Sequence, residues 1–269
     1  MKFAANVSLI FAQLPFADRI TSASDAGFEA VEIYWPQPEE LPATAWRRFA
    51  DQLEQDGTSV VQLNFTTGDR PGIDAGVAGE PDRAEMFRRN VPEALELAAQ
   101  LGCRRINALA GKRIAGVDPQ RQRATLLDSL ATAADQARPH GISIMVEALN
   151  RVDWPDYLLP DTRSAIRLLD ELARDNVKLL FDVYHSAMNG EDPVELLAEA
   201  GPRLGNVQLA DVPGRHEPGS GSLPIAPILA EVGRQGYRDW VGCEYLPRRP
   251  ESAAADLAAT RELLGEIAP

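Results

Sequence analysis

The amino-acid sequence predicts a single (β/α)8 barrel that spans residues 1–269, and three observations support this prediction. A short apolar run followed by an amphipathic stretch recurs eight times along the chain, which is the repeating unit of such a barrel. The 269 residues contain no linker and no low-complexity segment between these units, and barrels of this length routinely form one domain. No Gly-x-Gly-x-x-Gly follows the first apolar run, which disfavours an open, doubly wound sheet with the same number of units.

The predicted strands are rich in Val, Ile and Phe and are bounded by Gly, Pro, Asp or Asn, as strands usually are. In chain order they are residues 3–10, 30–35, 59–65, 105–110, 142–149, 177–183, 206–210 and 240–245. The clearest helices between and after them are residues 82–101, 119–137, 162–173 and 252–267, where apolar residues recur with helical spacing. Asp161 is the expected N-cap of the third of these helices, and Gly141 and Gly236 are expected chain reversals after helices.

Composition and charge exclude several classes of protein. Lys and Arg number 27 against 40 Asp and Glu, so the net charge is −13, and a field of that sign disfavours a general nucleic-acid binder. Two distant cysteines make no disulfide framework, which favours a cytoplasmic protein. No apolar run is long enough to cross a membrane. Asn6 and Ser8 interrupt the first apolar run, so we expect a strand there rather than a signal peptide.

Two connections are longer than the others. They are residues 66–81 and 211–223, which are rich in glycine and have no apolar period. Both follow predicted strands, so we expect them at the C-terminal mouth of the barrel, where active sites of this fold lie. Loops of this length in a compact domain are usually lids or disordered segments.

Four predicted strands carry a polar side chain near their C-terminal ends, where an apolar one is expected. These residues are Glu147, Asp182, Gln208 and Glu244, on the fifth to eighth strands. Alternation along a strand places Cys243 on the outer face if Glu244 faces inward, so we do not expect a catalytic cysteine. Any one of the carboxylates alone would be equally consistent with a buried ion pair or a surface position. Together they indicate one site.

The composition of this site predicts a metal. Buried carboxylates need a compensating cation, and the neighbouring segments offer few basic residues. A divalent ion supplies that charge. Because all four donors are oxygens, the set favours Mg²⁺ or Mn²⁺ over Zn²⁺.

Seven segments together resemble the hydroxypyruvate isomerase family of xylose isomerase-like TIM barrels. They are FAANVSLIF at the start, Asn64 with the following Gly68-Asp69, VEALN around Glu147, FDVYH around Asp182, VQLAD, RHEPGSG and VGCEY. The resemblance extends in order over nearly the whole chain. The wider group also contains 2-oxo-tetronate isomerases and ketose 3-epimerases, and these motifs separate its members less well.

The resemblance implies an aldose–ketose isomerase that interconverts hydroxypyruvate and tartronate semialdehyde through a metal-stabilised enediolate. It implies that Glu147 and Glu244 are the acid/base pair, that Asp182 and Gln208 complete the metal site, and that no nucleotide cofactor is needed. Related epimerases carry histidine where this chain has Gln208, so the identity of the metal stays open. General acid/base catalysis of this kind contributes about 10²–10⁴-fold.

An anionic hydroxy-oxo acid needs a cation, and the chain has only three lysines. Lys112, after the fourth strand, is either a clamp for the substrate carboxylate or a solvated loop lysine. Arg215 is a second candidate, able to make a bidentate contact. His185 is expected to hydrogen-bond the substrate, and Asn64 either contacts the substrate or makes a turn.

Two further residues are candidates to contact the site residues without contacting the substrate. Glu32 is a charge within an apolar strand, and His216 either supports the site or holds its own loop. The chain also departs from the family after RHEPGSG, where Ser222-Leu223-Pro224 replaces the usual Glu-Ile-Asn. This change lies in a loop that leads into a helix and leaves the four rim residues untouched.

Several alternatives remain after this argument. A 2-oxo-tetronate isomerase is the nearest, a ketose 3-epimerase is more distant, and a sugar-binding barrel without turnover is the non-enzymatic alternative. A nuclease acting on abasic sites would need a histidine-rich zinc cluster and a basic groove, whereas this chain has three histidines and a charge of −13. A homo-oligomer is possible for a barrel of this size, but no sequence feature determines its symmetry.

Overall fold

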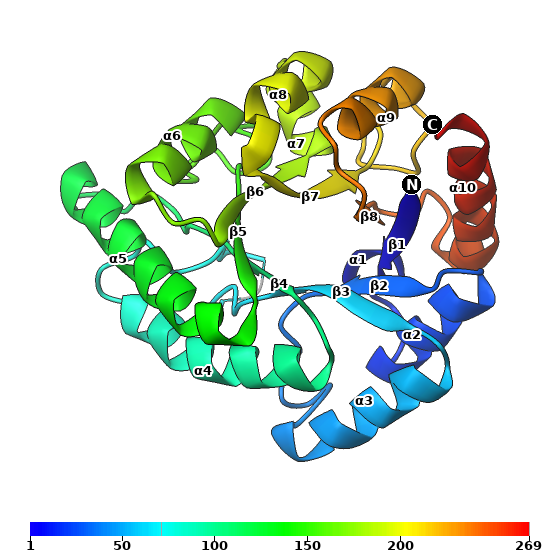
Figure 1. The fold of residues 1–269 in the computed structure, drawn as a ribbon, viewed down its shortest axis with the longest axis horizontal. Helices are drawn as coiled ribbons and strands as arrows, with labels where there is room; N and C mark the ends of the chain where they lie inside the picture. The colour runs from blue at the N-terminus through cyan, green and yellow to red at the C-terminus, as the bar shows by residue number, and fades with distance from the viewer. Residues whose placement is uncertain (71, 269) are drawn as a thin grey trace.

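Eight parallel strands close into a barrel, as the sequence predicted (Figure 1). The computed structural model describes residues 1–70 and 72–268. Each strand pairs with the next along the chain, and β8 pairs with β1 to complete the closure. The strands are β1 Lys2–Asn6, β2 Ala30–Ile33, β3 Ser59–Asn64, β4 Arg105–Ala108, β5 Ser143–Glu147, β6 Val177–Asp182, β7 Leu204–Leu209 and β8 Trp240–Cys243.

The longer helices form a ring outside the strands (Figure 1). In chain order the helices are α1 Val7–Ile10, α2 Phe16–Asp25, α3 Trp46–Gln55, α4 Ala84–Gln100, α5 Pro119–Ala137, α6 Thr162–Leu172, α7 Val183–Met188, α8 Pro193–Ala200, α9 Ile225–Arg234 and α10 Ala253–Ile267. Short 3-10 helices adjoin them: η1 Ala43–Ala45, η2 Arg138–His140, η3 Gly201–Arg203 and η4 Pro250–Ser252. No helix among the residues described is both long and apolar enough to cross a bilayer.

The first predicted strand is wrong over its second half. Only Lys2–Asn6 is extended, and residues 7–10 form the short helix α1. Val7 and Ile10, three residues apart, are the buried members of this helix, a spacing that suits a helical turn better than a strand. The other strands lie within their predicted segments, except that β7 begins two residues earlier.

Local sequence signals account for the helix ends. Asp161 caps α6 as predicted, because its side chain accepts from the Ser164 N–H at 2.8 Å and the Ser164 side chain completes a capping box. Gly141 follows η2 with φ 63°, and Gly236 follows α9 with φ 77°. That left-handed conformation is one that glycine adopts without strain.

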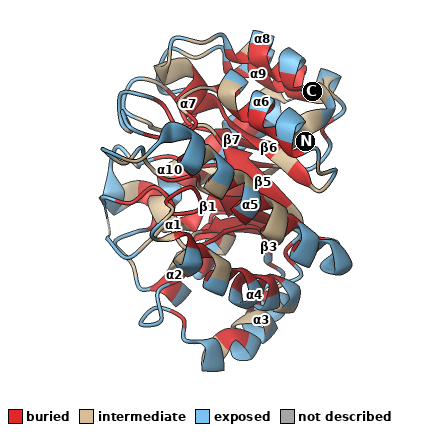
Figure 2. Ribbon diagram, turned by 90° about the vertical axis from the view of Figure 1, so that its left-hand side faces the viewer, coloured by how far each residue is buried: buried red, intermediate tan, exposed pale blue. Residues whose placement is uncertain are grey.

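Side chains on the strands alternate between two layers. Ile144 and Val146 of β5 join the apolar core, whereas Met145 lies inside the barrel, where a Cβ on Gly205 would contact its sulfur. Figure 2 shows the strands mostly buried and the helices exposed along their outer faces. Cys243 also belongs to the apolar core, as the alternation along the strand predicted, and burial raises the pKa of its thiol.

The second half of the connection over residues 66–81 is packed against the body of the protein rather than projecting from it. Residues 74–80 are buried. The carboxylate of Asp74 accepts hydrogen bonds from Arg70 and from Arg83, and Arg83 also binds Glu80 at 2.9 Å. This ion-pair cluster ties the connection to the start of α4, so residues 74–80 form a wall of the barrel mouth and not a free lid.

Candidate active site

The four polar residues predicted to lie at the rim are all buried at one end of the barrel. Glu147 and Asp182 are the last residues of β5 and β6, Gln208 is next to last in β7, and Glu244 directly follows β8. Their exposed fractions are between 2% and 5%. Asp182 and Gln208 are register partners on neighbouring strands. The active sites of this fold are built at this end of the strands.

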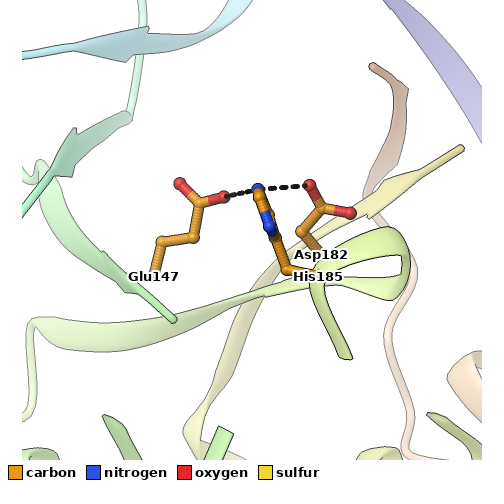
Figure 3. Close-up of side chains that lie close together, drawn as sticks. All are labelled: Glu147, Asp182 and His185. Carbon is orange, nitrogen blue, oxygen red and sulfur yellow. Dashed lines mark ion pairs between the residues drawn. The ribbon is translucent and has the colours of Figure 1, made fainter. Parts of the chain in front are cut away.

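Glu147, Asp182 and His185 form a group of potential metal ligands (Figure 3). Their ligand atoms all lie within 4.8 Å of one another. Nε2 of His185 is 3.8 Å from Oε1 of Glu147 and 3.6 Å from Oδ2 of Asp182. The sequence FDVYH creates this geometry locally. Asp182 ends β6 and caps α7 by accepting from the Tyr184 N–H at 2.8 Å, and the first turn of α7 then carries His185.

Arg215 binds the carboxylates of the site directly. Its Nη2 donates to Oδ2 of Asp182 at 3.0 Å and to Oε2 of Glu244 at 2.8 Å. The guanidinium also lies over the ring of Tyr184, 5.1 Å from its centroid. The sequence led us to expect that a metal supplies the compensating charge. Arg215, held at φ 58° in the loop after β7, supplies one positive charge of its own.

The charges in the site nevertheless do not balance. Three carboxylates, Glu147, Asp182 and Glu244, surround one guanidinium, which leaves two negative charges if all three are ionised. Burial, together with Glu244 and Asp182, raises the pKa of Glu147 well above its usual value. Burial raises the pKa of Asp182 to about 7 although Arg215 opposes the shift. Burial and the nearby Arg215 hold the pKa of His185 well below its ordinary value, so this imidazole is neutral. A divalent cation would remove the excess negative charge.

Gln208 presents an acceptor that has no partner. Its Nε2 donates to Oε2 of Glu32 at 2.7 Å, whereas its Oε1 is buried without a hydrogen bond. Such an orphaned oxygen is unusual in a folded protein and indicates an absent ligand or water. Together with the charge excess and the oxygen-rich donor set, it shows that these residues fit a divalent cation.

Glu32 lies inside the barrel and contacts Gln208. Its other oxygen, Oε1, accepts from Asn206 at 3.0 Å. Burial, and then the charge of Glu244, raises the pKa of Glu32 to about 7. The carboxylate fills space that a side chain on β8 would otherwise occupy, because a Cβ on Gly242 would lie 2.4 Å from Oε1 of Glu32.

Three residues that the argument from sequence missed hydrogen-bond the two glutamates. Asn107 donates to Oε2 of Glu147 at 2.7 Å. Asn6 and the hydroxyl of Tyr34 donate to Oε1 of Glu244, at 3.1 and 2.6 Å. Asn6 and Asn107 interrupt apolar strands in the same way as the four rim residues, so that signal was present in the sequence. Tyr34 carried no such signal, because aromatic residues are common in strands.

The remaining predicted residues lie outside the carboxylate cluster. The ammonium of Lys112 lies 4.9 Å from the ring centroid of Trp154. Asn64 is buried at the end of β3, beside its register partner Asn107. His216 holds its own loop, since its Nδ1 lies 2.8 Å from the carbonyl oxygen of Leu246 and its backbone pairs with Asp211.

Comparisons with known proteins match nearly the whole chain. The family model of the xylose isomerase-like TIM barrel matches residues 20–264. A putative hydroxypyruvate isomerase of Streptomyces coelicolor is 39% identical over 94% of this chain and 93% of its own. The 2-oxo-tetronate isomerase of Pectobacterium atrosepticum is 37% identical over 92% of each chain. The hydroxypyruvate isomerase of Escherichia coli is 31% identical over 94% of this chain and 96% of its own.

Solved structures share the architecture. One described as an AP endonuclease, family 2, from Brucella melitensis superimposes with a TM-score of 0.89 at 32% identity, covering 100% of this chain and 99% of its own. The IolI protein with a bound zinc atom superimposes with a TM-score of 0.80 at 18% identity, covering 99% of each chain. The second likeness shows the fold alone.

Proposed function

This chain belongs to the xylose isomerase-like TIM barrel family, and on that premise we propose that it is an isomerase that interconverts hydroxypyruvate and tartronate semialdehyde. Relatives named hydroxypyruvate isomerase, at 39% and 31% identity over most of the chain, support this choice. Membership of this family supports an isomerase activity. The substrate, the metal and the residue roles described below are our proposal.

One observation supports the proposal above all. Two buried glutamates with different hydrogen-bond partners lie in the same site, together with other side chains that could bind a cation. Glu147 receives a hydrogen bond from Asn107, and Glu244 receives hydrogen bonds from Arg215, Tyr34 and Asn6. Two carboxyl groups in different environments are what a reaction needs when one group accepts a proton and another returns it.

The reaction moves one proton between neighbouring carbons. A carboxylate takes a proton from C3 of hydroxypyruvate, which leaves an enediolate across C2 and C3. A carboxyl group returns a proton to C2, and the hydroxyl proton on O3 passes to O2, so no atom is gained or lost. Glu147 and Glu244 are the acid/base pair in this scheme, which contributes about 10²–10⁴-fold.

Glu147, Asp182, Gln208 and Glu244 would hold the cation, and the oxygen donors favour Mg²⁺ or Mn²⁺. A divalent cation held there supplies Lewis-acid polarisation of the substrate oxygens. His185 would donate a hydrogen bond to a substrate oxygen. Lys112 would bind the substrate carboxylate, and Arg215, which binds Asp182 and Glu244, would keep those side chains in place.

The second candidate is a 2-oxo-tetronate isomerase, favoured by relatives at 37% and 35% identity. It requires the same proton transfer on a longer acid, so the site residues would keep their roles. A nuclease fits the site poorly. Among the described residues, the group of potential metal ligands in this protein contains one histidine. The net charge of −13 also opposes a nucleic-acid substrate.

Proton NMR of hydroxypyruvate in D₂O tests the proposal. The protein is compared in a Mg²⁺-loaded sample, in a metal-stripped sample and as the Glu147→Gln variant. Loss of the C3 proton signal, with an aldehyde hydrate appearing, is expected for the Mg²⁺-loaded wild-type protein but not for the metal-stripped sample or for Glu147→Gln. Glu231→Gln is the matched control, because Glu231 is buried on α9 outside the barrel and pairs with Arg234. This control should exchange at the wild-type rate.

Other outcomes of this NMR experiment would change the proposed function or the assigned residue roles. Exchange of a 2-oxo-tetronate but not of hydroxypyruvate would favour the second candidate, and exchange at C3 of a ketose would favour an epimerase. Full activity of Glu147→Gln would refute the acid/base assignment. The absence of exchange with any of these substrates, with Mg²⁺ or Mn²⁺ present, would refute the proposed function.

A further inference from the structure

Two hydrogen-bond donors converge on one ring nitrogen of His185. The backbone N–H of Asn150 points at Nδ1 over 3.1 Å, and the side-chain Nδ2 of Asn150 lies 2.8 Å from the same atom. An imidazole nitrogen that faces two N–H groups is an acceptor and carries no proton. Both residues are buried, with exposed fractions of 0% for Asn150 and 2% for His185, so water does not compete for these contacts.

The orientation of the Asn150 amide follows from its other contacts. Its Oδ1 accepts from the backbone N–H groups of Val152 and Asp153, at 3.0 and 2.8 Å. Its Nδ2 donates to Oδ2 of Asp153 at 2.9 Å. The same carboxylate oxygen accepts from the hydroxyl of Tyr184 at 2.8 Å. A flipped amide would place its oxygen against a carboxylate and its nitrogen against two N–H groups, so the nitrogen must face His185.

We propose that Asn150 is a positioning residue that holds His185 in the Nε2–H tautomer. The proton therefore lies on the nitrogen that faces Glu147 and Asp182. In this tautomer, Nε2 is a hydrogen-bond donor without a free lone pair, so it does not bind a metal even though its position among the carboxylates suggests a third ligand. The cation site is then made of oxygens alone, which separates it from histidine-containing zinc sites.

The part His185 plays in turnover rests on the proposed function. A neutral Nε2–H aimed into the site suits an oxygen of a hydroxy-oxo acid, which accepts a hydrogen bond. The tautomer itself is a property of the resting protein and does not depend on the substrate. It is therefore measured without turnover, and it can hold even if hydroxypyruvate proves to be the wrong substrate.

Nitrogen NMR reads the tautomer directly. The protein is labelled with ¹⁵N-histidine, and two-bond ¹⁵N–¹H correlations are recorded near pH 7 without metal and with Mg²⁺. The chain has three histidines, so the variants His140→Gln and His216→Gln assign the signals. We expect Nδ1 of His185 to be unprotonated and Nε2 to be protonated in both samples. A proton on Nδ1, or a Mg²⁺-induced loss of the proton on Nε2, would overturn the proposal.

The variant Asn150→Asp tests the role of the side chain. It keeps the shape and the oxygen that accepts from residues 152 and 153, but it replaces the donor that faces His185 by an acceptor. We expect a proton to appear on Nδ1. Asn189→Asp is the matched control, because the Asn189 side chain accepts from the N–H of Arg151, next to Asn150, donates to the Pro160 carbonyl and makes no hydrogen bond to the His185 ring. The control should leave the wild-type pattern.

A charge-neutral swap covers the case in which Asn150→Asp does not fold. In the double variant Asn150→Asp with Asp153→Asn, the exchanged pair can still hydrogen-bond, and the net charge is unchanged. An acceptor still faces Nδ1, so the same gain of a proton is expected. If the folded single variant or the swap keeps the wild-type tautomer, the backbone N–H of residue 150 is sufficient to hold it, and the proposed role of the Asn150 side chain is overturned.

Discussion

Gly242 of β8 offers a sharp test of how the barrel interior supports the site. A Cβ built on this residue would lie 2.4–2.5 Å from the carboxylate atoms of Glu32, well inside the distance that real atoms tolerate. The carboxylate cannot simply retreat, because it accepts hydrogen bonds from Gln208 at 2.7 Å and from Asn206 at 3.0 Å. Gly242→Ala therefore forces either the strand or Glu32 to move.

The expected cost follows from these contacts. Overpacking of a core costs about 1–3 kcal/mol, and the loss of a hydrogen bond to a charged group adds about 1.5–3 kcal/mol. If part of each cost is relieved by relaxation, the free energy of unfolding falls by about 2–4 kcal/mol. At roughly 2–4 °C per kcal/mol for a chain of this size, Tm should fall by about 4–16 °C.

Thermal and urea unfolding of Gly242→Ala measure this loss. Gly265→Ala is the matched control, because no atom lies within 4 Å of a Cβ at this position in the last turns of α10. Its stability should be unchanged or higher by up to about 1 kcal/mol, the difference in helix propensity between Gly and Ala. Equal stability of Gly242→Ala and Gly265→Ala would refute the claim that Glu32 fills the space beside β8.

Three further predictions test other parts of the structure. Burial alone would raise the pKa of Asp74, but hydrogen bonds from Arg83 and Arg70 hold this pKa well below its usual range. Asp74→Asn should therefore lower the free energy of unfolding by about 1–3 kcal/mol at pH 7. Because a depressed pKa stabilises the fold only while the carboxylate is ionised, this difference should shrink below about pH 4 in urea titrations, and a constant difference would contradict the ion-pair explanation. Lys112→Ala should raise KM for the anionic substrate more than it lowers kcat, and unchanged values of both would remove Lys112 from the site. Adding Mg²⁺ or Mn²⁺ at about 100 times Kd should raise the free energy of unfolding by about 2.7 kcal/mol. This stabilisation should be smaller in Gln208→Ala at the same metal concentration. Equal stabilisation of the variant and the wild-type protein would exclude Gln208 as a ligand.

The sequence by itself determined the barrel and the residues at its rim. Both depend on regularities that are local along the chain. An apolar run followed by an amphipathic helix specifies one unit, and a parallel barrel places the ends of all its strands at one mouth. A carboxylate or amide at such a strand end, as at Glu147 and Gln208, is costly to bury and therefore conspicuous in an apolar segment. Asn6 and Asn107 carried the same signal, which the argument from sequence did not use.

Only the tertiary structure decided which groups touch within the site. Asn6 and Glu244, which share a hydrogen bond, are 238 residues apart, and that contact exists because β8 closes against β1. The path of the loop after β7 decides that Arg215 binds Asp182 and Glu244. The direction of the Gln208 amide depends on Glu32, and the tautomer of His185 depends on Asn150. Such contacts follow from barrel closure and loop paths in three dimensions, which the periodicity of a sequence does not encode.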